Sequence, residues 1–117
     1  MVALITIILN EAPYGSERSY NGLRTAMALL KGEDTQVNVF LMADATFCAL
    51  EGQTTPDGYY NIERMITFIA RKGKIGACGT CMDARGLSNP KLVDGIHRSS
   101  MAELTDWILS SENVITF

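Results

Sequence analysis

Five segments of the chain have the residue pattern of β-strands. The first, residues 2–9, is a run of aliphatic and β-branched side chains without polar alternation, which is typical of a strand covered on both faces. The segment at 92–96 contains Gly95, which weakens it as a strand. The predicted strands are residues 2–9, 36–42, 74–77, 92–96 and 114–117.

Segments with helical periodicity separate the first three strands. Ser16 is predicted to cap a helix that extends to Gly32, and Asn61 is predicted to cap one that reaches about Lys72. Apolar side chains recur every three or four residues in both segments, which gives each helix one face for the core. These side chains are Tyr20, Leu23, Met27 and Leu30 in the first helix, and Ile62, Met65, Ile66 and Ile69 in the second.

A third long helix is predicted after the fourth strand. Ser100 and Glu103 have the spacing of a capping box, which marks a helix start. The apolar face of this helix is predicted to consist of Met101, Leu104, Trp107 and Ile108. A short helix is predicted at residues 46–50, capped by Asp44, and another from about Thr80 or Met82 to Gly86. Residues 53–58 have loop composition.

The alternation of strands and helices predicts an α/β fold. Parallel strands joined by helical crossovers would form one five-stranded, mostly parallel sheet with helices on both faces, and residues 1–117 are expected to be a single domain. Ligands and reactive groups gather at the carboxyl ends of the strands in such sheets. Residues 10–16, 43–46, 78–81 and 97–99 are predicted to form the loops at that edge.

Charge and hydropathy exclude several classes of function. The net charge is −3, so the chain lacks the basic excess that a general affinity for nucleic-acid phosphates requires. The apolar run at residues 2–9 is too short to span a bilayer and lacks the flanks of a signal peptide. We therefore expect a cytoplasmic protein with no membrane partner, in a compartment where thiols stay reduced.

The three cysteines are the residues most suited to chemistry. Cys78 ends a predicted strand just before a predicted helix, where backbone N–H groups favour the thiolate. Cys81 lies three residues on and can meet Cys78, while Gly79 lets the turn bend tightly. Arg85 is near enough in sequence to add positive charge, and the lone Cys48 is interpreted as core packing.

Two familiar uses of a cysteine pair fit the sequence poorly. A zinc site needs about four ligands, and only a coincidence of folding would join His97 to the three cysteines, so no metal is expected. His97 is interpreted as a surface or edge residue. A thioredoxin-like oxidoreductase is not favoured, because the pair follows the third strand and its Gly-Thr insert contains no proline.

Residues 76–86, Gly-Ala-Cys-Gly-Thr-Cys-Met-Asp-Ala-Arg-Gly, closely resemble the cysteine segment of the DsrE/DsrF-like family. Supporting similarities extend over nearly the whole chain and include residues 13–18, 40–45, 60–64, 100–107 and 114–117. The resemblance implies a three-layer α/β/α fold and assembly as a homo-oligomer, often a trimer or hexamer.

The resemblance also implies a function. Relay members of the family accept sulfane sulfur as a cysteine persulfide and pass it to a partner protein. Cys78 holds the place of their acceptor cysteine, ahead of Arg85-Gly86, whereas Cys81 is additional and marks a Cys-x-x-Cys subgroup. The hypothesis is therefore a sulfur carrier that needs no cofactor and has sulfur donor and acceptor proteins as its partners. Cys81 is the possible resolving thiol, and no direct binding of nucleic acid is expected.

Two other interpretations remain open at the level of sequence. A Cys78–Cys81 disulfide could regulate partner binding without sulfur transfer. Alternatively, the carboxyl edge of the sheet could hold a small molecule. The candidate binding residues are Asn10, Ser16, Arg18, Asp44, Gly79, Thr80 and Arg85. Asn10 and Asp44 are also ordinary turn residues, Ser16 an ordinary cap and Arg18 an ordinary solvated charge.

Overall fold

A computed structural model describes residues 2–117, and within that range five strands form one sheet. The order across the sheet is β4-β3-β2-β1-β5, and each pair of neighbours is parallel. The strands are β1 (Ala3–Leu9), β2 (Thr35–Leu41), β3 (Lys74–Cys78), β4 (Ile96–Ser99) and β5 (Asn113–Thr116). The predicted α/β fold with a five-stranded sheet is confirmed.

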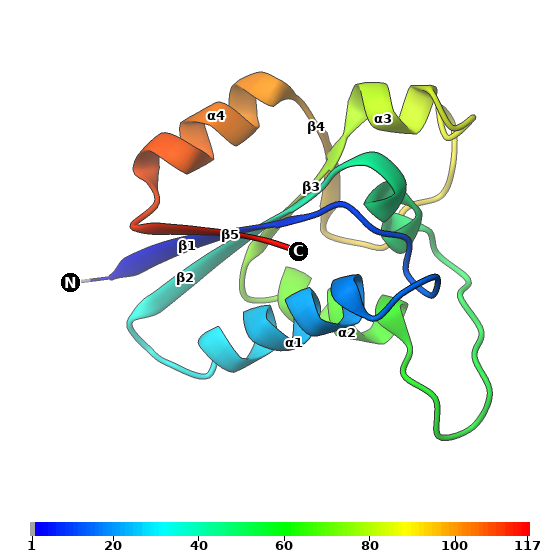
Figure 1. The fold of residues 1–117 in the computed structure, drawn as a ribbon, viewed down its shortest axis with the longest axis horizontal. Coiled ribbons are helices and arrows are strands. Elements are labelled where there is room, and N and C mark those ends of the chain that lie inside the picture. The colour runs from blue at the N-terminus through cyan, green and yellow to red at the C-terminus, as the bar shows by residue number, and fades with distance from the viewer. Residues whose placement is uncertain (1) are drawn as a thin grey trace.

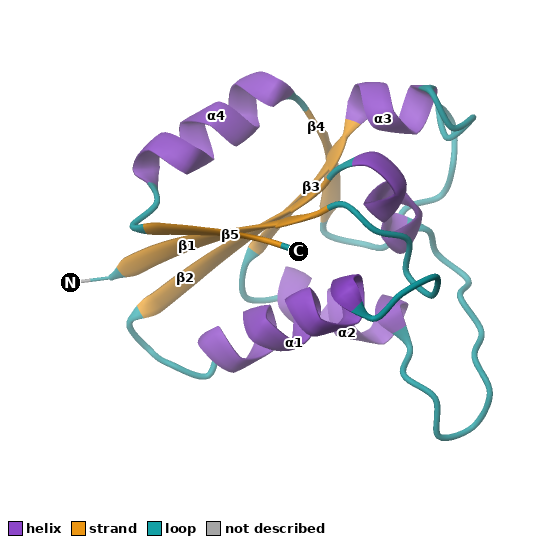
Figure 2. Ribbon diagram, in the orientation of Figure 1, coloured by secondary structure: helices purple, strands orange, loops and turns teal. Residues whose placement is uncertain are grey.

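The helices cover both faces of the sheet. α1 and α2 lie against one face and α4 lies against the other, while α3 follows the carboxyl end of β3 (Figure 1, Figure 2). A 3₁₀ helix, η1, follows β2 in the same way. The bounds are α1 (Arg18–Leu29), η1 (Ala43–Ala49), α2 (Ile62–Ala70), α3 (Gly79–Asp83) and α4 (Met101–Ser110).

Alternation along the strands divides the buried side chains between the two faces. Val39 and Leu41 of β2 pack into the larger cluster beneath α1 and α2. Phe40, between them, joins a smaller cluster with Leu104 and Trp107 of α4. Cys78 belongs to this smaller cluster, so the last residue of β3 lies on the face that α4 covers.

The fourth strand lies further along the chain than predicted. β4 begins at Ile96 and pairs with β3 through Ser99, so 97–99 is strand rather than the loop after one. Gly95, with φ +93°, forms the bend before it. Val93 is buried from an irregular segment, where its N–H donates to the carbonyl of Ala49, and this burial explains the apolar pattern that suggested a strand.

Two predicted helix starts are confirmed by side-chain caps. The Asn61 side chain accepts a hydrogen bond from the N–H of Arg64 at 3.1 Å, and α2 begins directly after Asn61. The Ser100 hydroxyl accepts one from the N–H of Glu103 at 3.2 Å. The carboxylate of Glu103 binds Ser99 and His97 rather than returning to the cap.

Three other helix starts differ from prediction. Glu17, rather than Ser16, precedes α1, and its side chain makes no capping bond. η1 begins at Ala43 after Met42, so Asp44 lies in the first turn and pairs with Arg85 instead of capping. α3 begins at Gly79, one residue before the earlier predicted start at Thr80, because Cys78 itself occupies the cap position, and it ends at Asp83 rather than Gly86.

The apolar face predicted for α4 is correct for half of its residues. Leu104 and Trp107 are buried against the sheet. Met101 and Ile108 are 61% and 40% exposed, and Leu109 is 79% exposed. Because Leu104 and Trp107 already fill the space above Phe40, the remaining apolar side chains of α4 face outward.

Candidate active site at Cys78 and Cys81

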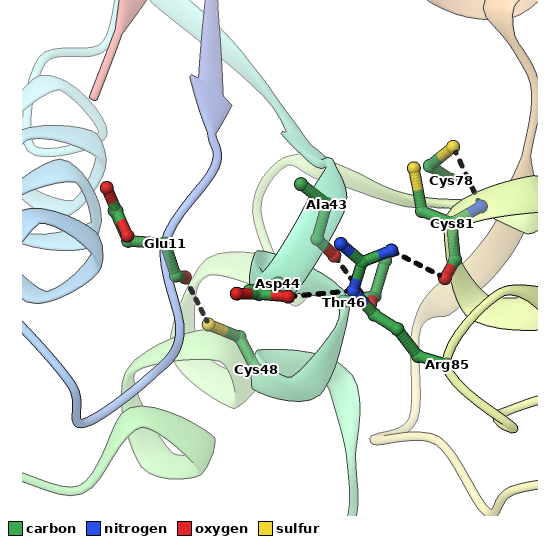
Figure 3. Close-up of polar contacts among 8 residues, drawn as sticks. All are labelled: Glu11, Ala43, Asp44, Thr46, Cys48, Cys78, Cys81 and Arg85. Atoms are coloured by element: carbon green, nitrogen blue, oxygen red, sulfur yellow. Dashed lines mark hydrogen bonds and ion pairs between the residues drawn. The ribbon is translucent and has the colours of Figure 1, made fainter.

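Cys78 lies at the carboxyl edge of the sheet, where β3 ends and α3 begins. Its side chain is folded back over the first turn of the helix, where Sγ accepts a hydrogen bond from the N–H of Cys81 at 3.4 Å (Figure 3). The hydroxyl of Thr80 lies 3.5 Å from the same sulfur. Cys78 is only 6% exposed, so these protein groups replace much of the water around the sulfur.

The two thiols differ in acidity. Burial acts to raise the pKa of Cys78, but hydrogen bonds from Cys81 and Thr80 outweigh burial and hold that pKa below the ordinary cysteine value. Burial also raises the pKa of Cys81, and its hydrogen bond to Cys78 raises it further. Near neutral pH, Cys78 is therefore the better source of thiolate, while Cys81 remains a thiol.

Ala43 brings the backbone of a neighbouring strand end to the cysteine pair. Its φ of +52° lies in the left-handed region, which is uncommon for a residue other than glycine. A backbone hydrogen bond from Ala43 opposes the rise in the pKa of Cys81. The hydroxyl of Thr46 donates to the Ala43 carbonyl at 2.8 Å and holds this turn.

Arg85 contacts Cys81 rather than Cys78. Its Nη1 donates to the carbonyl oxygen of Cys81 at 3.1 Å, and its Nε donates to Oδ1 of Asp44 at 2.8 Å (Figure 3). The guanidinium thereby joins η1 to α3, and its charge acts to lower the pKa of Cys81. Arg85 therefore lies near the pair as predicted, but its charge affects the pKa of Cys81, the second cysteine.

A second arginine near the pair was not found from the sequence. The guanidinium of Arg98 makes two parallel hydrogen bonds to the carboxylate of Asp83, at 3.0 and 2.7 Å. It also lies directly over Gly79, where a Cβ would be 2.7 Å from Arg98 Cζ. The register that pairs Ala77 with Arg98 would have revealed this neighbour, but the misplaced fourth strand concealed it.

Not all of the candidate binding residues share one site. Asp44, Gly79, Thr80 and Arg85 surround the cysteines. Asn10 lies at the end of β1, where both its N–H and its side-chain amide donate to the carbonyl of Phe117 at 3.2 Å. Ser16 accepts a long, 3.4 Å bond from the N–H of Arg18, which is itself exposed on the surface.

The remaining candidates for chemistry are held in structural contacts. Cys48 is fully buried, with Sγ 4.0 Å from the carbonyl of Glu11, and burial raises its pKa to about 12. His97 bonds to Glu103 at the sheet edge. Among residues 2–117, no three His, Cys, Asp or Glu side chains are grouped as ligands for a metal ion.

A hollow of about 460 Å³ lies against α2, away from the cysteine pair. It is lined by Gln53, Asn61, Glu63, Arg64, Thr67, Phe68 and Arg71. No helix in the described part of the chain is long and apolar enough to cross a membrane.

The chain is similar to known proteins over its whole length. It is 42% identical to protein YchN of Escherichia coli over 115 residues, which cover 97% of each chain. It is 38% identical to an uncharacterised protein of Methanopyrus kandleri, over 99% of this chain and 95% of the other. The crystal structure of the E. coli YchN protein superposes with a TM-score of 0.87 at 39% identity, covering both chains fully.

A family model agrees with these similarities. The sequence model of the DsrE/DsrF-like family matches residues 3–117, which include all five strands and both residues of the cysteine pair. The family resemblance noted in the cysteine segment is thus confirmed for the chain as a whole. The protein belongs to the DsrE/DsrF-like family.

Proposed function

We propose that this protein is a cytoplasmic sulfur carrier that holds sulfane sulfur on Cys78 as a persulfide. The observation that carries the proposal is the unequal pair of thiols at the end of β3. Cys78 has a lowered pKa and a sulfur held by donors, while Cys81 has a raised pKa and hydrogen-bonds to it. The sulfur-relay association of the family gives this pair a substrate class.

The loading step follows from the acidity of Cys78. The Cys78 thiolate attacks the outer sulfur of a donor persulfide, R–S–SH, so that a new S–S bond forms on Cys78 as the donor S–S bond breaks. The donor leaves as the thiolate R–S⁻ with the electron pair of the broken bond. The product is Cys78–S–SH, and no external oxidant or reductant is needed.

The carried sulfur has two routes out of the site. An acceptor thiolate can attack the outer sulfur, taking it as a new persulfide and returning Cys78 as thiolate. Alternatively, the Cys81 thiolate can attack Sγ of Cys78, which forms the Cys78–Cys81 disulfide and expels HS⁻. The raised pKa of Cys81 slows this second route and so favours transfer to a partner.

Mass spectrometry of the loaded protein tests the proposal. The reduced chain is incubated with a small persulfide donor, and its peptides are mapped without reducing agent. The expected result is a gain of about 32 Da, one sulfur atom, on the peptide that contains Cys78. An unmodified Cys78, or an equal gain in the Cys78→Ser variant, would contradict the assignment.

A thiol-redox switch is the second candidate function. Both thiols are free, and the hydrogen bond from the Cys81 side chain to Cys78 supports closure to a disulfide. Equilibration in glutathione buffers distinguishes the candidates. A disulfide that forms within the cytosolic range of potential without any sulfur donor would favour the switch. A pair that stays reduced there, yet accepts sulfur, would favour the carrier.

We propose that the exposed apolar side chains of α4 and β5 form a subunit contact. Met101, Ile108 and Leu109 of α4 and Val114 of β5 are each at least 39% exposed. α4 lies on the side of the sheet that also holds Cys78 (Figure 1), so a contact through these side chains would place a second subunit on that side. A trimer or hexamer would cover these side chains, and a donor or acceptor protein would approach the open edge.

A further inference from the structure

The guanidinium of Arg98 lies against the turn that joins Cys78 to α3, and its position depends on Gly79. Arg98 leaves β4 beside Ala77, and its guanidinium extends to Gly79, the residue after Cys78. A Cβ on Gly79 would lie 2.7 Å from both Cζ and Nε of Arg98, closer than atoms pack. The absence of a side chain at position 79 is therefore what lets the guanidinium rest on the turn.

Asp83 fixes the orientation of this guanidinium. Its two carboxylate oxygens accept from Nη1 and Nη2 at 3.0 and 2.7 Å, a bidentate pair that sets the plane of the group. Ser88 in turn donates to Asp83 at 3.2 Å. The pair with Asp83 uses two of the five N–H donors of the guanidinium, and the three that remain include the Nε donor on the Gly79 side.

The guanidinium is close enough to Cys78 for its charge to act there. Consecutive Cα atoms are about 3.8 Å apart, so contact with Gly79 places Cζ within about 8 Å of the Cys78 Cα. The Cα of Cys78 therefore lies within the Debye length of the guanidinium, which is about 10 Å at 0.1 M salt. The charge of Cys78 also contributes, less than Asp83, to the raised pKa of Arg98.

We propose that Arg98, held by Asp83 against Gly79, supplies the positive charge that stabilises anionic sulfur on Cys78. The proposal rests on the sulfur-carrier function, because both the attacking thiolate and the loaded persulfide are anions at neutral pH. Arg98 acts through Cys78 and is therefore a positioning residue for charge rather than a reacting group.

The other basic side chains near the site, Arg85 and His97, are bound to carboxylates away from the Cys78 sulfur. Arg85 is engaged with Asp44 and the Cys81 carbonyl, and His97 is engaged with Glu103. The titratable groups on the elements around Cys78 are Lys74 of β3, Cys81 and Asp83 of α3, His97 and Arg98 of β4, Glu103 and Asp106 of α4, and Asp44 and Cys48 of η1, with Arg85 after α3. Among the cations in this set, Arg98 alone lies over the residue next to Cys78.

The proposal is tested on the reduced full chain by alkylation with iodoacetamide. Peptide mapping gives the rate at which Cys78 reacts, and the rate is measured across a range of pH. Arg98→Gln should raise the pKa of Cys78 by about 0.3 to 0.5 unit, which slows alkylation at neutral pH roughly two- to threefold. Arg98→Lys should restore most of the rate. High salt should reduce the difference between wild type and Arg98→Gln, because the guanidinium is half exposed.

Gly79→Ala provides an independent variant, because the added methyl displaces the guanidinium without removing its charge. It should slow alkylation in the wild-type background and add little in the Arg98→Gln background. An unchanged Cys78 pKa in Arg98→Gln, or full additivity of the two substitutions, would overturn the proposal. If the pKa shifts as expected but no persulfide forms on Cys78, the carrier function fails while the role of Arg98 in the charge of Cys78 stands.

Discussion

The sulfur of Cys78 accepts a hydrogen bond from the backbone N–H of Cys81, three residues further along the chain, at 3.4 Å. This contact exists because β3 ends at Cys78 and the next residue already begins α3. The helix turn thus brings the second cysteine and its amide to the first. The unequal acidity of the two thiols follows from that geometry.

The Cys81 thiol should determine how much of Cys78 is ionised. Cys81→Ala removes a side-chain donor to Cys78, so the pKa of Cys78 should rise and its alkylation at neutral pH should slow several-fold. Cys81→Ser keeps a hydroxyl donor and serves as the matched control, with a smaller effect. Equal rates in wild type and Cys81→Ala would show that the side-chain bond does not tune Cys78.

Cys48 should stay unreactive while the protein is folded. Its side chain is fully buried and its pKa is raised to about 12, so neither access nor thiolate is available near neutrality. A chromogenic disulfide reagent should modify Cys78 and Cys81 in the native protein, and Cys48 only after addition of denaturant. Modification of Cys48 at the rate of Cys78 without denaturant would contradict its assignment to the core.

Gly76 should tolerate no side chain. A Cβ there would lie 2.9 Å from Cβ of Ser99 and 3.2 Å from the ring of Trp107. Gly76→Ala should therefore reduce the free energy of unfolding by about 1–3 kcal/mol through overpacking, measured by urea denaturation. Gly15→Ala is the control, because its Cβ would make an ordinary 3.6 Å contact with Ala12. Equal stability of the two variants would argue against close packing at Gly76.

Protonation of the Glu103 carboxylate should make the stability of the folded protein depend on pH in the acid range. Burial acts to raise its pKa, but hydrogen bonds from Ser99 and His97 outweigh burial and hold the pKa below the ordinary value. A depressed pKa in the folded state stabilises the protein above the unfolded pKa of about 4.3, and this contribution is lost as pH falls through the lower, folded value. Thermal unfolding of Glu103→Gln should therefore depend less on pH in that window. An unchanged pH dependence would exclude Glu103 as its source.

The apolar side chains of α4 should govern assembly. Leu109 is 79% exposed, and Leu109→Glu would place a charge in the proposed subunit contact. Light scattering coupled to size exclusion should show an oligomer for wild type and a lower mass for the variant. Ala28→Glu, an exposed position on α1 across the sheet, should leave the mass unchanged. A wild-type monomer, or loss of mass in both variants, would contradict this contact.

The sequence was most informative where one physical requirement dominates. β1 is apolar on both faces because helices cover the sheet from both sides, so residues 2–9 stand out. Asn61 and Ser100 are recognisable because few residue types cap a helix. The cysteine pair was found by its spacing and its place after a strand.

The sequence was less informative where tertiary contacts replace local pattern. β4 is an edge strand in which His97 and Arg98 are exposed, so its composition does not resemble that of a strand. Leu92 and Val93 are apolar because they belong to an irregular segment that packs on η1. Their apolar pattern led to a predicted strand at 92–96, four residues before the observed start of β4 at Ile96. The loss of the β4 register then hid the approach of Arg98 to Gly79.

The most direct test of the sulfur-carrier proposal is the fate of the sulfur on Cys78 with and without Cys81. Peptides of wild type and of Cys81→Ser are mapped over time after exposure to a small persulfide donor, and released sulfide is measured alongside. A gain of about 32 Da on Cys78 should persist in Cys81→Ser. In wild type it should give way slowly to a Cys78–Cys81 disulfide, with one sulfide released per chain. A disulfide formed without any persulfide on Cys78, or sulfur loading that survives Cys78→Ser, would contradict the proposal.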